Sequence, residues 1–437
     1  MIIMACFIAP AQRVAVFSLN FTLLRILVLF GTVRILSRHE WMGFRWNSLD
    51  TVLVAWTICG TIAYTFLFGS AEALKFKLGT SYDAVGMYFL FRCLVREWAD
   101  IERATLGFVF VSVPVLAAFL IERATRHNLF AFLGGVPAIT LEREGRLRCQ
   151  GAFAHPILAG CFWASVMPLI AALWWRGGQS RWLATVGLAA SGLIVVLCAS
   201  STPVAAAGGG LVGLCMFPLR RQMRPILWGS VALLATLHLV MKAPVWHLIA
   251  RIDLAGGSTG WHRANLITQA INHFDEWWLL GVRSIASWGV WKGDVTNQYL
   301  LEGVRGGAAT AILFITMIWL AFRRVGALCR SVGEDRYHLI VAWTLGVALF
   351  VHAVSFIAVN YFGQIWMVFF LQLAMPASLP TSRASMVNAS PRRLLQAQSV
   401  GLNLQGTSKE GASAPQGHSS NRRVPPPVAS PSAGCPR

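Results

Sequence analysis

The sequence predicts an all-α integral membrane protein, and two observations carry that prediction. Apolar runs of about 17–22 residues recur along most of the chain, and this is the length that crosses a bilayer core as a helix. Charged residues make up 13% of the chain, against about 25% in a soluble domain. Backbone polar groups find no water in the bilayer core and the runs lack the alternation of barrel strands, so helices are the expected spanning structure.

Residues 1–375 form the expected polytopic membrane domain, with about twelve transmembrane helices. Residues 123–152 and 243–306 are polar and interrupt the pattern. The second is the large loop between spans nine and ten. The weakest span is the first, because it is short and contains Arg13. The expected spans are residues 2–17, 19–36, 51–68, 81–96, 105–122, 153–175, 182–199, 203–219, 225–242, 307–322, 338–355 and 357–375.

Arginines in the short connections between spans set the expected orientation. They follow spans two, four, six, eight and ten, so all of them fall on one side when the twelve spans are threaded through a bilayer. The positive-inside rule makes that side cytoplasmic, together with both termini. The loops 123–152 and 243–306 then share the opposite face. The formal net charge of +19 thus reflects membrane topology, and basic loops suit anionic headgroups, so no nucleic-acid partner is expected.

The last part of the chain differs in composition from the rest. Residues 376–437 are rich in Ser, Pro, Ala and Gly, and seven basic residues face the single acid Glu410. Such a segment cannot bury a core, so a disordered cytoplasmic tail is expected. The 9 cysteines are scattered through the chain without metal-ligand spacing, so we expect no disulfide framework, no metal and no cofactor.

The segment REGRLRCQGAFAHPILAG, residues 143–160, joins the first polar loop to a span. Gly151 and Pro156 mark the start of the helix, and Arg146 and Arg148 come just before it. A helix start presents free N–H groups and the positive end of the helix dipole. Together with the arginines this predicts a phosphate or pyrophosphate site. The alternative is that the arginines extend to lipid headgroups.

The segment SSTPVAAAGGGLVG, residues 200–213, begins with hydroxyl side chains and continues with small residues. Small residues allow transmembrane helices to approach closely, so packing is the preferred interpretation over a hydroxyl-lined site.

The large loop carries most of the remaining candidates. Its stretch from residue 259 to 274 has a helix-like pattern that Ser258 or Thr259 could cap. Its many tryptophans suit sugar rings as well as a membrane interface. His262 and His273 are candidate general bases, since histidine titrates near neutral pH, although each could equally be a hydrogen-bonded interface residue. The candidate cations for a substrate diphosphate are Arg251, Arg263 and Arg283.

A dense polar set precedes span ten. Asp294, Asn297, Gln298 and Tyr299 lie shortly before it, and could bind sugar hydroxyls or orient a catalytic base. An ordinary helix start, with Asp294 or Thr296 as the N-cap, is the alternative.

Taken together, these segments resemble the O-antigen ligase and O-antigen polymerase superfamily, over about residues 50–375. The stretch RLRCQGAFAHPILAG is similar to that family's entry to a mid-chain span, with Arg148, Gly151, Phe153 and Pro156 at the matching positions. The stretch GDVTNQYLLEGVRGGAATAILF is similar to the family's loop exit. The order of the motifs and the expected topology add weight to the short individual matches.

The resemblance implies an enzyme of the bacterial inner membrane. Such proteins are metal-independent glycosyltransferases that take a glycan from undecaprenyl diphosphate on the periplasmic face. Lipid A core or another lipid-linked glycan is the acceptor, and other polysaccharide assembly proteins are possible partners. Outer-loop arginines hold the diphosphate, and Arg148 and Arg263 fall closest to such positions.

One departure from the family pattern leaves the function open. Where the ligases have His before Asn, this chain has Thr296 before Asn297. The base is then missing unless His262 or His273 substitutes, which favours a polymerase or an exopolysaccharide-type relative. The alternatives are a flippase or transporter for lipid-linked sugars, and a non-catalytic membrane subunit of a polysaccharide assembly complex. We find no internal repeat of the kind that many transporters carry.

Overall fold

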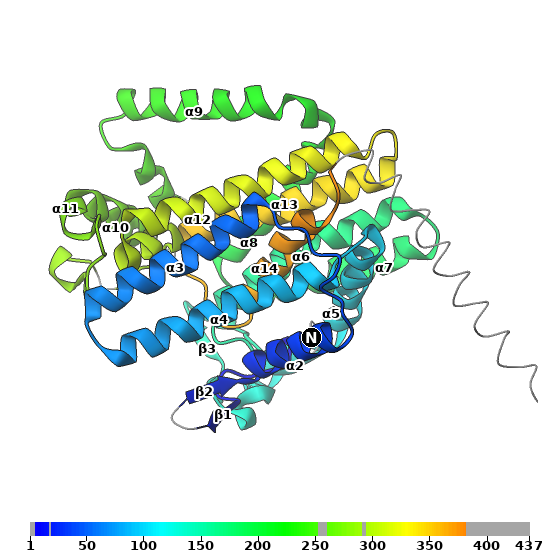
Figure 1. The fold of residues 1–437 in the computed structure, drawn as a ribbon, viewed down its shortest axis with the longest axis horizontal. Coiled ribbons are helices and arrows are strands. Elements are labelled where there is room, and N and C mark those ends of the chain that lie inside the picture. Colours follow the sequence, from blue (N-terminus) through cyan, green and yellow to red (C-terminus); the bar gives the residue numbers. More distant parts are fainter. Residues whose placement is uncertain (1–4, 17–18, 252–259, 291–293, 382–437) are drawn as a thin grey trace, which may run out of the picture. The chain divides into compact units, whose positions relative to one another are not determined.

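The computed structural model describes residues 5–16, 19–251, 260–290 and 294–381, of which 75% are helical (Figure 1). Met1–Arg383 form one compact unit. The strands are β1 Arg13–Val16, β2 Leu19–Thr22, β3 Leu141–Arg143 and β4 Arg146–Arg148. The α-helices are α2 Leu23–Ser37, α3 Ser48–Phe68, α4 Ala71–Leu94, α5 Trp98–Thr125, α6 Pro156–Ala172, α7 Gln179–Leu197, α8 Ser201–Cys215, α9 Met223–Val240, α10 Gly260–Asn272, α11 Phe274–Trp277, α12 Gln298–Ser331, α13 Arg336–Ala358 and α14 Ile365–Ser378. Short 3-10 helices are η1 Leu129–Leu133, η2 Leu173–Arg176, η3 Phe217–Gln222, η4 Val245–Arg251 and η5 Ala286–Trp288.

Among the described residues, 7 helical segments are long and apolar enough to cross a membrane. α8 and α14 are apolar but shorter. The lengths and composition of these helices agree with a membrane-embedded, all-α protein. The candidate spans are Ser48–Phe68, Trp98–Thr125, Pro156–Arg176, Gln179–Leu197, Phe217–Val240, Gln298–Ser331 and Arg336–Ala358.

The expected first span, residues 2–17, is wrong. Its second half is strand β1, which pairs with β2 in an antiparallel hairpin, Arg13 opposite Thr22. Pro10 interrupts the apolar stretch, and the β-branched Val14 and Val16 favour a strand. The expected second span is shortened for the same reason, because α2 starts only at Leu23, after β2.

The expected boundaries also shift near the C-terminus. The tail was expected from residue 376, but α14 continues to Ser378 with Pro376 inside it. The rest of the expected tail, from residue 382 on, lies outside the described residues.

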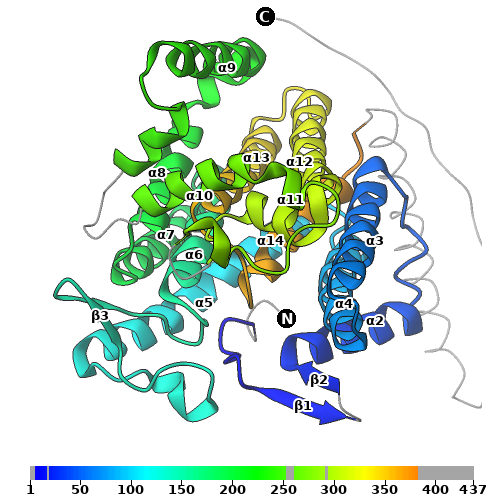
Figure 2. The ribbon, with the colours of Figure 1, turned by 90° about the vertical axis from the view of Figure 1, so that its left-hand side faces the viewer.

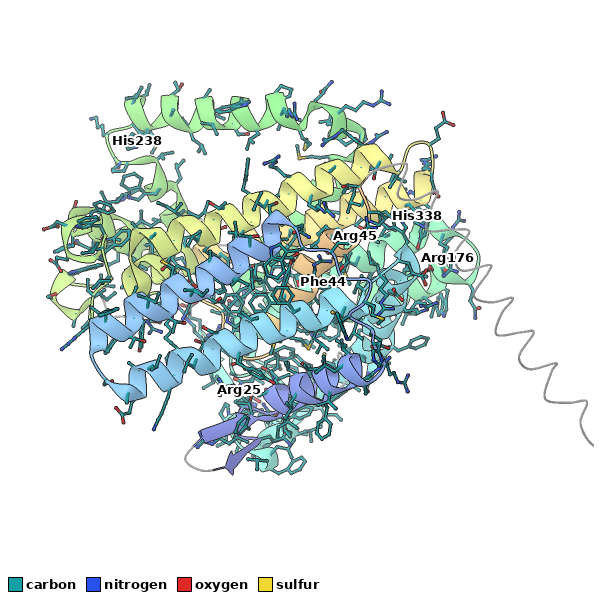
Figure 3. All side chains as sticks on the ribbon, viewed as in Figure 1. Arg25, Phe44, Arg45, Arg176, His238 and His338 are labelled. Carbon is teal, nitrogen blue, oxygen red and sulfur yellow. The ribbon has the colours of Figure 1, made fainter. Side chains whose placement is uncertain are left out.

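Long helices run back and forth between two ends of the compact unit (Figure 1). We call one the loop end, which holds residues 126–155, 198–200, 241–251, 260–290, 294–297 and 359–364. The other is the basic end, where the short arginine-containing connections meet. There Arg176 pairs with Glu102, and the tilted rings of Trp98 and His338 have centroids 5.0 Å apart. Figure 3 shows Arg176 and His338 at this end.

The core is built around α6, which is buried along almost its whole length. Helices α5, α7, α8, α13 and α14 surround it and contribute to one continuous apolar cluster. Small residues permit the close approach of α6 and α8, because a Cβ on Gly160 would lie 2.6 Å from Pro203 Cβ. By contrast, α9 packs mainly on the flanking η3 and η4 and buries no residue.

A buried ion pair joins α3 to α4 near the basic end. Arg92 Nε donates to Asp50 Oδ1 at 3.0 Å, and Tyr88 donates its hydroxyl to the same oxygen at 2.6 Å. Arg92 also donates to Arg45 O and to Ser378 Oγ, so it fixes the starts and ends of helices that are far apart in sequence. A second pair, Arg25–Asp83 at 2.8 Å, holds α2 against α4 (Arg25 is labelled in Figure 3).

The large polar segment is more helical than its sequence suggested. α10 coincides with the expected helix, whose proposed caps Ser258 and Thr259 lie outside the described residues. α12 starts at Gln298, inside the expected loop, and is broken at Gly307, where φ is 75° and ψ is 171°. In Figure 2 the loop end faces the viewer, and α10 and α11 lie across the ends of the central helices. A small separate core, which includes Leu266, Trp277 and Val304, holds this segment together.

Candidate functional site

Arg148 lies at the end of a β-hairpin at the loop end. β3 and β4 pair antiparallel with Leu141 opposite Arg148. The Arg148 side chain is only 9% exposed, and its Nε is buried without a hydrogen-bond partner. Buried donors are nearly always paired in folded proteins, so an unused guanidinium N–H at this position points to a ligand.

Glu122, near the end of α5, binds the turn after the hairpin and does not neutralise the charge of Arg148. Its carboxylate accepts the backbone N–H of Gln150 at 3.2 Å and of Gly151 at 2.8 Å, and the Thr140 hydroxyl at 3.3 Å. These three donors occupy Glu122 and fix the chain between the hairpin and α6. No carboxylate of the described residues lies within ion-pair distance of Arg148 or Arg263.

His155 caps the N-terminus of α6, directly before Pro156. Its Nδ1 accepts the backbone N–H of Ile157 at 3.2 Å. Burial and the nearby Arg148 lower the pKa of His155 to about 4. The imidazole is therefore neutral at pH 7, and because Nδ1 acts as an acceptor, its proton is on Nε2.

Arg263 reaches the same region from the first turn of α10. Its Nη2 donates to Thr202 Oγ1 at 3.0 Å, and its Nε is buried without a hydrogen-bond partner. Thr202 is itself buried in the first turn of α8. His262 precedes Arg263 on α10 and is 7% exposed.

The starts of three helices converge around these side chains. α6 and α8 begin side by side, as the approach of Gly160 to Pro203 shows, and Arg263 joins the first turn of α10 to that of α8. Helix N-termini carry free N–H groups and a partial positive charge, so each adds to the attraction for an anion.

The electrostatics favour an anion among these side chains. Burial lowers the pKa of Arg148, and the adjacent Arg143 lowers it further. Burial likewise lowers the pKa of Arg263, with an opposing effect of Cys161 and a further lowering by Arg143. Arginine stays charged despite such shifts, so Arg143 lies close to two other buried or part-buried cations. An anion bound among them would relieve both the desolvation and the repulsion.

Geometry limits what this site can do chemically. Two guanidinium groups, a neutral imidazole N–H and helix N-termini suit a group with several anionic oxygens, such as a diphosphate. Among the residues that the structure describes, no group of three or more His, Cys, Asp or Glu could hold a metal ion. The described cysteines are all free thiols.

Two of the sequence candidates lie elsewhere at the loop end. Arg283 is exposed and donates its Nε to Leu67 O at 2.8 Å, so it ties the loop to the end of α3. His273 lies beyond the far end of α10, ten positions after Arg263, which is about 15 Å along a helix. Its ring stacks on Trp288 at 5.0 Å, and its Nδ1 lies 2.9 Å from Gln269 O.

The remaining candidates are less close to the arginines or are occupied. Asp294 is exposed, and Asn297, not Asp294 or Thr296, is the N-cap of α12. Asn297 accepts the N–H of Leu300 at 3.1 Å and donates to Ile357 O at 3.1 Å, so both ends of its amide are used. Arg146 is exposed on the hairpin. The side chain of Arg251 lies outside the described residues.

Sequence reasoning missed several residues that the fold places at or near the site. Arg143, His155 and Thr202 all belong to segments of interest but were not singled out as ligands. The position of His155 directly before a proline at a helix start was a signal for an N-cap. The contact of Thr202 with Arg263 had no sequence signal, because the two are joined only by the packing of α10 on α8.

A second polar group lies at the start of α12. Glu302 accepts hydrogen bonds from Trp56 Nε1 at 2.9 Å and from Gln298 Nε2 at 2.6 Å. Gln298 Oε1 in turn accepts the backbone N–H of Tyr361 at 2.8 Å. Both carboxylate oxygens are thus engaged, and the group locks α3 and the α13–α14 connection onto α12.

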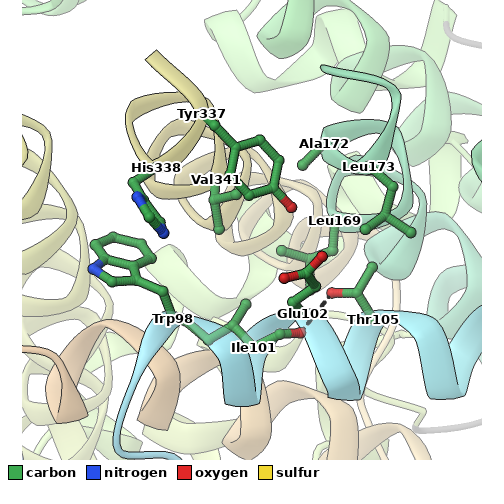
Figure 4. Close-up of a pocket in the computed structure, with 10 residues that line it drawn as sticks. All are labelled: Trp98, Ile101, Glu102, Thr105, Leu169, Ala172, Leu173, Tyr337, His338 and Val341. Carbon is green, nitrogen blue, oxygen red and sulfur yellow. Dashed lines mark hydrogen bonds between the residues drawn. The ribbon is translucent and has the colours of Figure 1, made fainter. Parts of the chain in front are cut away.

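A small pocket lies at the basic end, away from the arginines (Figure 4). Its lining is mostly apolar and comes from α5, α6, η2 and α13, with Glu102 and His338 at its edge. Glu102 is paired with Arg176, so this pocket offers no free charge of its own for a ligand.

Comparison with known proteins gives no family assignment. No protein-family model matches the chain, and no curated protein sequence is significantly similar to it.

Proposed function

We propose that this protein transfers a glycan from undecaprenyl diphosphate to an acceptor glycan or lipid, as members of the O-antigen ligase and polymerase superfamily do. The observation that carries the proposal is the pair Arg148 and Arg263. Among the described residues, their buried Nε atoms have no hydrogen-bond partner and no carboxylate offsets their charges. Burying an uncompensated cation is costly unless a ligand completes the site.

The proposed reaction places most of its demand on the leaving group. An acceptor hydroxyl attacks the anomeric carbon of the donor sugar, and the bond from that carbon to the diphosphate oxygen breaks. Negative charge builds up on the departing diphosphate, and the electron pair of the broken bond stays there. Arg148 and Arg263 would stabilise this charge without a metal ion.

The proton of the acceptor hydroxyl needs a base. His262 supports that role better than His273 because it neighbours Arg263 on α10, whereas His273 lies beyond the other end of that helix. His155 is unsuited, since its Nδ1 is occupied and its Nε2 carries the proton. Asp294 and Asn297 take no part in this proposed scheme.

The proposed location is the inner membrane of a bacterium, with the loop end on the periplasmic face. The apolar helices support membrane embedding. The arginines gathered at the basic end support a cytoplasmic position for that end. Lipid-linked donor and a glycan or lipid acceptor would then meet at the loop end, with other polysaccharide assembly proteins as possible partners.

The test is complementation of a deletion strain with the wild-type gene or with Arg148→Ala, Arg263→Ala or Arg283→Ala. Removal of one charge-stabilising donor typically lowers the rate by about 10²–10³-fold, so we expect the first two variants to lose surface polymer and to accumulate lipid-linked glycan on the periplasmic face. Arg283→Ala is the control, because that arginine only contacts a backbone carbonyl. Membrane insertion is checked by the amount of each variant in the membrane fraction.

Three results would contradict the proposal. Lipid-linked glycan trapped on the cytoplasmic face of the deletion strain would indicate a flippase. Normal polymer in both arginine variants, with none in the deletion strain, would indicate a non-catalytic subunit. Unchanged polymer in the deletion strain would exclude a role in this pathway.

A further inference from the structure

His155 is the one imidazole at the arginine site whose protonation state the described structure defines. The backbone N–H of Ile157 donates to Nδ1 at 3.2 Å, and this contact is the N-cap of α6. An imidazole that accepts at Nδ1 while neutral must carry its proton on Nε2. None of the described residues hydrogen-bonds to that Nε2, so the N–H is available to a ligand.

Burial and a neighbouring charge keep the ring neutral. Burial lowers the pKa of His155 to about 4, and the positive charge of Arg148 adds to this effect. Glu122 is held by Gln150, Gly151 and Thr140 and has no contact with the imidazole that would favour a second proton. Between pH 5 and 8 the ring therefore offers one fixed donor and no titration.

The Nε2–H donor of His155 belongs to the same site as the Arg148 guanidinium. Arg148 is buried, and its Nε has no hydrogen-bond partner among the described residues. A ligand that satisfies Arg148 at the start of α6 lies near the cap residue, because Arg148 is close enough to His155 for its charge to lower the pKa of the imidazole.

We infer that His155 is a binding residue for the donor diphosphate, to which its Nε2–H donates a hydrogen bond while its Nδ1 holds the start of α6. The inference rests on the proposed function for the identity of the ligand. It assigns the histidine a fixed donor role, distinct from the base role considered for His262. A cap and a ligand contact on one ring also mean that substrate binding and the position of α6 depend on the same side chain.

Two substitutions separate the two roles of the ring. Serine is a good N-cap but is too short to reach the ligand, so His155→Ser keeps the cap and removes the donor. Glutamine places an amide N–H about where Nε2 lies but is a poor cap, so His155→Gln keeps the donor and loses the cap. The expected pattern is crossed: His155→Ser is the more stable variant, and His155→Gln is the better binder. A purely structural role would make both properties fall together.

The experiment measures glycan transfer by the purified full chain in proteoliposomes that contain the lipid-linked donor, with inorganic pyrophosphate as competitor. A hydrogen bond to a charged group is worth enough to predict a rise of about 10- to 100-fold in the donor KM and in the pyrophosphate inhibition constant for His155→Ser. For His155→Gln we expect a rise several-fold smaller. Thermal unfolding of each variant in detergent gives the stability order.

Outcomes for the two proposals are distinguishable. If His155→Ser has the KM and inhibition constant of the wild type while both constants rise in Arg148→Ala, the role of His155 is overturned and the diphosphate site stands. If Arg148→Ala also behaves as the wild type, or if the wild type transfers no glycan, the proposed function fails and the role of His155 fails with it. A KM that tracks the unfolding temperature across both His155 variants likewise overturns the donor role.

Discussion

Gly307 is the position at which a single methyl group should separate the loop segment from α12. The residue has φ 75° and ψ 171°, a region that only glycine adopts without strain. A Cβ built there would lie 2.2 Å from Leu279 O, a backbone atom that cannot rotate away. The N–H of Ala308 donates to Trp278 O at 2.8 Å, and that of Val282 to Val304 O at 2.7 Å, so the same movement breaks these two bonds.

The size of the effect follows from these terms. Strain in this backbone region costs about 1–3 kcal/mol, and each lost hydrogen bond about 1 kcal/mol. We therefore expect Gly307→Ala to lower the free energy of unfolding by about 3–5 kcal/mol. The matched control is Gly289→Ala: this glycine also has a positive φ, 67°, but a Cβ there would meet no atom within 4 Å. Only the left-handed conformation is penalised at that position, by about 1–2 kcal/mol.

The assay is equilibrium unfolding in mixed detergent micelles, together with amide hydrogen exchange. We expect the Val282 and Ala308 amides to lose protection in Gly307→Ala and to keep it in Gly289→Ala. Because α10 belongs to the same segment, the Arg263–Thr202 contact should loosen, and the proposed transfer activity should fall although no site residue has changed. Equal stability of the two variants, with unchanged exchange at Val282, would refute the close-approach argument.

Two further predictions concern charge. The pKa of His155 is about 4, below its ordinary value of 6.5, so as pH falls from 6.5 toward 4 His155 is protonated in the unfolded chain but stays neutral in the folded protein. The free energy of unfolding should therefore be at its full value above pH 6.5 and about 2 kcal/mol lower at pH 5. The measurement is a pH series of unfolding, and the same loss in His155→Gln would contradict this prediction. Asp50 and Arg92 are buried, with side chains 0% and 4% exposed, so Arg92→Met should lower the free energy of unfolding by about 3–5 kcal/mol by leaving Asp50 without its cation. The control Arg103→Met removes an arginine that is 69% exposed and pairs with Glu97 and Asp100, and it should change the unfolding midpoint little. Equal midpoints for the two variants would show that burial does not set the cost.

The helices of the membrane unit were largely predictable because their signal is local. Apolar length sufficed to find α3, α5, α7 and α13, whose bounds differ from the expected spans by up to seven residues. It failed at β1, where an apolar stretch of similar composition forms a hairpin. It also failed at Gln298, where polar residues before Gly307 still form a helix because tertiary contacts with α3 and α13 satisfy them.

The candidate site was predictable only in part. Arg148 and Arg263 stood out because cations in long polar loops are unusual on the side that the positive-inside rule leaves poor in charge. The family resemblance favoured these two, but composition and spacing gave no physical reason to rank them above Arg283 or Arg146. The physical reason comes from burial and hydrogen-bond partners. Arg283 is exposed and donates to a backbone carbonyl, whereas the buried Nε atoms of Arg148 and Arg263 have no hydrogen-bond partner among the described residues.

By itself the sequence determined the helical membrane class and which polar segments could hold a ligand, since hydrophobic length and residue type are properties of short stretches of chain. Only the tertiary structure decided which charges meet. Residues 148, 155, 202 and 263 come together because α6 and α8 pack closely through Gly160 and Pro203, and α10 folds back across their ends. Interaction energies depend on distance and burial, and neither is encoded at any one position.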